Sequence, residues 1–189
     1  MGSRRDQLLD AAIEVLGTSG MHGLTHRRVD TAAGVAHGSC SNHFRTREAL
    51  LDAVVERFSE RERRNWEEIA VRSAPRTADE LALAMTLFAH EATTTHRTLT
   101  LARYAILVES GTQPALRARL LATGAQVNEW FHVWLRLAGS DDPERHAPIL
   151  MNHWTGVVLH ELAIPDPAFD PSEQLKALVA AIVGERVGT

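Results

Sequence analysis

The residues best suited to chemistry lie together between residues 25 and 47, where hydrogen-bonding side chains stand among arginines. No acid occurs from Thr31 to Arg47, so nothing in that stretch repels a polyanion. Histidine, serine and asparagine can read base edges in DNA, and arginine can neutralise phosphates. The candidate DNA-binding residues are Thr25, Arg27, Arg28, His37, Gly38, Ser39, Ser41, Asn42, His43, Arg45 and Arg47.

Two short predicted helices, at about 26–33 and 36–44, position these side chains. Thr25 is a good N-cap for the first helix, and Gly34 ends it where a left-handed residue is wanted. Such a pair is a helix-turn-helix, whose second helix enters the major groove, about 12 Å wide. The alternative is a helix pair used only for packing. The apolar side of the module would be formed by Val29, Ala33, Val35, Cys40 and Phe44.

Over about residues 5–52 the sequence resembles the TetR family of transcriptional regulators. Two positions depart from the family pattern: Ser41 stands where a tyrosine is usual, and Arg47 where a lysine is usual. The resemblance implies a repressor with a helical ligand-binding body, in which the last two helices form a homodimer and a small-molecule effector releases the operator. The matching residues are Ala11, Ala12, Gly20, Leu24, Thr25, Val29, Ala33, Gly34, Val35, Gly38, Phe44, Arg47, Glu48, Ala49 and Leu50.

Charge is divided unevenly along the 189 residues. Residues 1–47 carry six arginines and four acids, whereas the whole chain has a net charge of −4. A basic head on an acidic body is expected when one end meets phosphate. The single cysteine and the absence of a signal peptide or a long apolar run predict a cytoplasmic protein.

Helical periodicity dominates the sequence, and no convincing strand pattern occurs, so we expect an all-α fold of about nine helices. We predict a helix-turn-helix domain at 1–47 and an effector-binding and dimerisation domain at 48–189. The expected helices lie at about 3–18, 26–33, 36–44, 46–72, 78–94, 98–110, 114–138, 142–163 and from 171 or 172 onward.

The body offers aromatic and charged candidates for a ligand pocket: Phe88, Arg103, Trp130, Trp134 and Trp154. Aromatic side chains line many pockets but also fill ordinary cores, and both readings stay open. Arg103, which lies near Glu109 in the sequence, would orient an anionic ligand or pair with an acid.

Dimerisation is expected through the last two helices, at about 142–163 and from 171 or 172 onward. The second of these has an apolar stripe that a single chain need not cover. The stripe consists of Leu175, Leu178, Val179, Ile182 and Val183.

Catalytic and metal chemistry find little support. His90 and His96 are six residues apart, whereas a zinc-protease motif needs histidines four apart. His146, His153 and His160 recur every seven residues, so successive ones lie about 10.5 Å apart along a helix, too far to share a metal. We therefore expect no enzyme, no cofactor and no metal.

Several alternatives stay open. A buried Cys40 is expected to pack rather than to act as a redox switch. The rivals to a ligand-released repressor are a regulator without a ligand, and a helical carrier or enzyme. Effector, operator, regulated genes and the sign of regulation are not encoded in any pattern here.

Overall fold

The computed structural model describes residues 3–72 and 74–183, without the side chains of 65–72, 123–124 and 126–127. Its described residues form helices joined by turns and loops and contain no strand, as the periodicity predicts. The helices are α1 (Arg4–Gly23), α2 (His26–Ala32), α3 (Ser39–His43), α4 (Arg47–Arg72), α5 (Ala78–Thr93), α6 (Arg97–Ser110), α7 (Pro114–Ala138), α8 (Pro143–Ala163) and α9 (Ser172–Val183).

The chain forms two compact units, which we call the head unit (1–65 and 97–124) and the body unit (66–96 and 125–189). The predicted functional boundary after residue 47 is therefore not a break in packing, because one apolar core continues from α1 through α4 to Ile106 of α6 and Leu116 of α7. The assignment of DNA binding to residues 1–47 stays a prediction.

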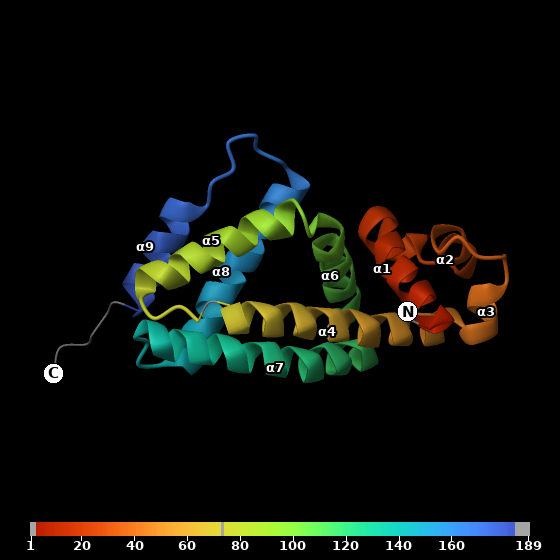
Figure 1. Cartoon of the computed structure of the whole chain (residues 1–189), viewed down its shortest axis with the longest axis horizontal. Coiled ribbons are helices and arrows are strands. Elements are labelled where there is room, and N and C mark those ends of the chain that lie inside the picture. Colours follow the sequence, from red (N-terminus) through yellow and green to blue (C-terminus); the bar gives the residue numbers. More distant parts are fainter. Residues whose placement is uncertain (1–2, 73, 184–189) are drawn as a thin grey trace. The chain divides into compact units, whose positions relative to one another are not determined.

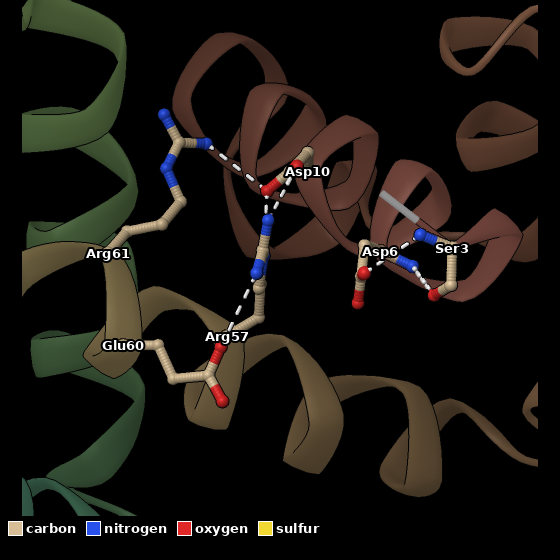
Figure 2. Close-up of polar contacts among 6 residues, drawn as sticks. All are labelled: Ser3, Asp6, Asp10, Arg57, Glu60 and Arg61. Atoms are coloured by element: carbon tan, nitrogen blue, oxygen red, sulfur yellow. Dashed lines mark hydrogen bonds and ion pairs between the residues drawn. The ribbon is translucent and has the colours of Figure 1, made fainter. Parts of the chain in front are cut away.

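An ion pair between Asp10 of α1 and Arg57 of α4 joins these two helices. Arg57 donates from Nε and Nη2 to the two carboxylate oxygens of Asp10, at 3.0 and 2.9 Å. Arg61 Nη1 lies 3.5 Å from the same carboxylate, as Figure 2 shows. Arg57 is only 17% exposed, so this two-pronged contact sets the angle at which α1 meets α4.

The start of α1 is set by a capping box. The Ser3 hydroxyl accepts a hydrogen bond from the Asp6 N–H, and the Asp6 carboxylate accepts one from the Ser3 N–H (Figure 2). The hydrogen bond from the Ser3 N–H is the main cause that lowers the pKa of the Asp6 carboxyl. The helix therefore begins where the sequence predicts, although it ends at Gly23 rather than Thr18, with a non-helical Gly20 (φ 64°) inside.

Helix α6 packs directly on α1 within the head unit (Figure 1). The closest approach is at Gly17, where a Cβ would lie 2.1 Å from the carbonyl oxygen of Thr98. No larger residue fits there without moving one of the helices. Helix α1, on which α2 of the helix-turn-helix packs, is thus also in close contact with α6.

The body unit is built around α5, which packs against α8 and α9. Trp154 of α8 is buried and donates its indole N–H to the backbone oxygen of Met85 at 3.0 Å. Leu175, Val179 and Val183 of α9 are also buried inside this unit. These three residues of the stripe are therefore covered within the chain, where α9 packs on α5 and α8, and dimerisation through the last two helices stays a prediction.

No helix of the described residues is both long and apolar enough to cross a membrane.

Candidate nucleic-acid interface

The turn between α2 and α3 is organised by the buried carboxylate of Asp30. One oxygen accepts the N–H of Gly38 and the other accepts the N–H of Cys40, both at 2.7 Å. Asp30 is 1% exposed. Gly38, at φ 96°, has the left-handed conformation that glycine adopts without strain. The carboxylate thus caps α3 from the side of α2.

Two longer-range hydrogen bonds hold the ends of the helix-turn-helix. His26 Nε2, at the start of α2, donates to the carbonyl oxygen of Phe44 at 2.7 Å, directly after α3. Gln7 Nε2 of α1 donates to the carbonyl oxygen of Ala33 at 2.9 Å, where α2 ends. Because α3 has only five residues, such contacts rather than its own helical bonds fix its position.

Helix α3 is shorter than predicted, spanning Ser39–His43 instead of 36–44. The difference arises at Gly38, whose left-handed backbone cannot belong to an α-helix. His37 therefore lies in the turn before α3, yet remains exposed beside the helix.

The outward side of this segment carries hydrogen-bonding groups that the chain itself leaves available. His37, Asn42 and Arg45 are exposed, and within the described part of the chain their side chains make no hydrogen bond. Ser39 and Ser41 instead bond inward, to the carbonyl oxygens of Ala36 and Gly38. The structure thus separates the two serines from the candidate base-reading residues Asn42 and His37.

The predicted phosphate contacts occupy two places. Thr25, Arg27 and Arg28 line a hollow of about 500 Å³ beside α1 and α2, together with Ser19 and Thr31. Two guanidinium groups and three hydroxyls suit a phosphate oxygen. Thr25 also caps α2, since its hydroxyl accepts the N–H of Arg28 at 3.3 Å.

Arg47 lies apart from this hollow, at the start of α4. It is exposed, but its Nη2 donates to the carbonyl oxygen of Met21 at 2.8 Å. One nitrogen of its guanidinium is therefore used within the chain, and the sequence did not indicate this contact. The guanidinium carries further N–H donors, and Arg47 is exposed, so these donors stay available for a phosphate.

Cys40 is fully buried, and burial together with the charge of Asp30 raises the pKa of its thiol to about 11. A redox-active cysteine needs a thiolate and access to solvent. Cys40 has neither, so the packing interpretation is favoured over a redox switch.

The candidate effector residues fall in different units. Phe88 and Trp134 stack in the body unit, with ring centroids 6.0 Å apart and planes at 20°. Trp130 is half-buried in the same unit. Arg103 belongs to the head unit, where it pairs with an acid, Glu62, at 2.7 Å.

The three histidines that recur along α8 have separate surroundings. His146 Nδ1 lies 2.8 Å from the hydroxyl of Ser140, while His153 and His160 are exposed and line a cavity of about 820 Å³. Nowhere in the described residues do three metal-binding side chains gather.

Asp30 is the functional residue that sequence reasoning missed. In the sequence it stands out only as a negative charge within a basic segment. The signal that could have revealed it is that Asp30 is the only acid between residues 15 and 47. An isolated acid in such a segment is expected to have a structural partner, here the backbone of the turn.

The chain matches two family profiles. "Bacterial regulatory proteins, tetR family" covers residues 8–54, and "Tetracyclin repressor-like, C-terminal domain" covers residues 76–185. The HTH-type transcriptional regulator BetI of Escherichia coli is 40% identical over 52 residues, 28% of this chain. That match spans only about a quarter of the length of BetI, namely 27%.

Solved structures resemble the chain over nearly its whole length. EbrR, a multidrug binding protein complexed with ethidium, has a TM-score of 0.70 and 26% identity, covering 96% of this chain and 98% of EbrR. A TetR-family member from Streptomyces coelicolor A3 gives 0.69 and 26%, covering 96% and 99%. A Rhodococcus transcriptional regulator, at 0.75 and 22% over 96% and 95%, shares the fold.

Fold and interface together define a helix-turn-helix transcriptional regulator, not an enzyme. Since the family profiles match more than half of its residues, the chain belongs to the TetR family of bacterial regulatory proteins.

Proposed function

We propose that this regulator binds a specific operator through α3 and the turn before it, and that a small-molecule effector releases it. The observation that carries the proposal is the exposed row of His37, Asn42 and Arg45, which bond to nothing else in the described chain. Side chains held beside a rigid helix with unused donors and acceptors are what base readout requires. The protein acts in the cytoplasm, where its operator lies.

Within this interface the roles divide by chemistry. His37, Asn42 and His43 read bases, whereas Arg27, Arg28, Arg45 and Arg47 hold phosphates and set the affinity for any DNA. Ser39, Ser41, Thr25 and Gly38 act mainly by shaping the backbone, since their hydroxyls or N–H groups bond within the chain.

The test is selection of bound sequences from random duplex DNA, followed by affinity measurements across a salt series. Asn42→Ala is expected to lose about 1–3 kcal/mol of discrimination at one base pair. Arg45→Ala is expected to weaken cognate and scrambled duplexes alike and to reduce the salt slope by about one. If selection returns no enriched sequence, or if the two variants exchange these effects, the proposed interface is wrong.

The effector site is proposed around the aromatic residues of the body unit. Phe88 and Trp134 stack in near-parallel planes, an arrangement in which aromatic rings attract one another. EbrR, which resembles the chain, is described as complexed with ethidium and with proflavin. We infer a planar aromatic effector for this chain, bound in the body unit, to which Trp130 and Trp154 also belong.

Quenching of tryptophan fluorescence by ethidium and proflavin tests this inference. Trp134→Leu is expected to reduce the quenching, and bound probe is expected to lower operator affinity. By linkage, operator DNA must then lower probe affinity by the same factor. A regulator without a ligand would show no quenching by any flat compound and unchanged operator binding across a metabolite panel.

A homodimer through α8 and α9 is the proposed assembly. The buried stripe of α9 no longer argues for it, but the opposite faces do: His153, Gly156 and His160 of α8 are exposed, and so are Ala177 and Ala181 of α9. Small side chains allow two helices to approach closely, and a two-fold interface pairs each surface with itself.

Gly156→Arg tests the dimer cleanly, because a Cβ at Gly156 meets nothing within 4 Å in the chain itself. The variant should keep its thermal midpoint as a folded chain but sediment as a monomer at micromolar concentration. Thr112→Arg, in an exposed turn of the head unit, is the matched control and should stay dimeric. A monomeric wild-type chain would remove the proposal.

A further inference from the structure

The start of α1 brings the cationic side chain of Arg5 to the end of α3. The Arg5 guanidinium lies over the ring of Phe44, with its central carbon 5.6 Å from the ring centroid. Phe44 follows α3 directly, and the ring of His43 lies 6.2 Å from that of Phe44. Residues nearly forty positions apart therefore meet at the C-terminal end of the helix proposed to read DNA.

Stacking leaves the binding edge of Arg5 unused. A guanidinium uses its flat face on an aromatic ring, while the N–H donors lie in its plane and point away from that ring. Arg5 is exposed, and its side chain makes no hydrogen bond within the described chain. Asp6, which interacts electrostatically with Arg5, has its carboxylate bonded to the backbone of Ser3 in the capping box. The contact with Phe44 thus holds near the end of α3 a guanidinium whose N–H donors have no hydrogen-bond partner in the described chain.

We propose that Arg5 is a further phosphate-binding residue of the DNA interface, holding the backbone at the C-terminal end of α3 beside Arg45. The proposal rests on the proposed function, and it adds a contact from α1 that lies outside the helix-turn-helix. The ring of Phe44 then has two functions: it packs in the core, and it contacts the guanidinium of Arg5. A bidentate arginine–phosphate contact here would fix the depth at which α3 enters the groove.

Arg4 provides the matched control. It is exposed, neighbours Arg5 in the sequence and carries the same charge, but its Nη1 donates to Gln7 Oε1 at 3.0 Å. That bond draws it along α1. A difference between the two positions therefore reports on placement rather than on net charge.

The experiment compares Arg5→Gln, Arg5→Lys and Arg4→Gln in full-length protein, using the selected operator and a scrambled duplex from 50 to 300 mM salt. Arg5→Gln should weaken both duplexes by the same factor, about fivefold at low salt, and flatten the salt slope by about one. Arg5→Lys should keep the slope with intermediate affinity, because it retains the charge but not the fork. Arg4→Gln should change either affinity less than twofold.

Thermal midpoints separate binding from support of the fold. If Arg5→Gln lowers the midpoint but leaves the salt slope at the wild-type value, Arg5 only supports Phe44 and the proposal is overturned. Equal effects from Arg4→Gln and Arg5→Gln would also overturn it. Failure of the wild-type chain to bind any duplex is a different result, which removes the proposed function itself.

Discussion

Replacing Asp30 with alanine removes the acceptor that holds two backbone N–H groups of the turn before the proposed reading helix. The N–H of Cys40 is buried, so losing its partner costs about 1–3 kcal/mol. The N–H of Gly38 is half-buried and can turn to water, which limits its cost to about 1 kcal/mol. Removing a buried charge also recovers its desolvation cost, so we expect a loss nearer 2 than 4 kcal/mol.

For a chain of this length, such a loss lowers the thermal midpoint by about 4–8 °C. Asp30→Asn keeps the size of the side chain and one acceptor oxygen, but it places an amide N–H against the second backbone donor. We expect it to lose roughly half as much stability as Asp30→Ala. Thr31→Ala, at the exposed neighbour, is the control and should stay within about 0.5 kcal/mol.

We expect the turn to affect DNA binding as well, because the five-residue α3 is too short to be kept in place by its own hydrogen bonds. Asp30→Ala should therefore weaken the operator more than a scrambled duplex, and hydrogen exchange at the amide of Cys40 should accelerate. Wild-type exchange at that amide together with an unchanged thermal midpoint would refute the role assigned to Asp30.

Other parts of the head unit give three further predictions. Gly17→Ala should destabilise the protein by about 1–3 kcal/mol, because the added Cβ clashes with the carbonyl of Thr98. The roughly 1 kcal/mol gained in helix propensity offsets only a part of this cost. An unchanged denaturation midpoint would contradict the close approach of the two helices. Asp10→Asn should cost about 1 kcal/mol, less at high salt, because its bidentate pair with Arg57 is lost; a salt-independent loss would indicate packing instead. The pKa of about 11 for Cys40 lies above that of an unfolded thiol, so the contribution of the thiol to stability is complete below about pH 9 and is lost between about pH 9 and 11. Denaturation of wild type and of Cys40→Ala over that pH range should show the difference. At pH 8 a thiol reagent should label Cys40 in the folded protein at least about a hundredfold more slowly than in the unfolded chain.

The sequence by itself determined the helical class and the place of the helix-turn-helix. Each depends on residues within a few positions of one another. Thr25 caps α2 as predicted, since its hydroxyl accepts the N–H of Arg28 three residues on. The helix-forming periodicity of the body likewise predicted α5 to α8 to within a few residues.

Tertiary structure decided which partner each side chain meets. The apolar stripe of α9 is visible in the sequence, but whether α5 or a second chain covers Leu175 depends on how distant segments pack. Arg103 could pair with any acid nearby, and the choice of Glu62 over Glu109 is made by the packing of α6 on α4. The same holds for Arg5 on Phe44, which no local pattern brings together. Local patterns specify a helix and its apolar side, whereas contacts between distant residues arise only when the chain closes on itself and buries those sides together.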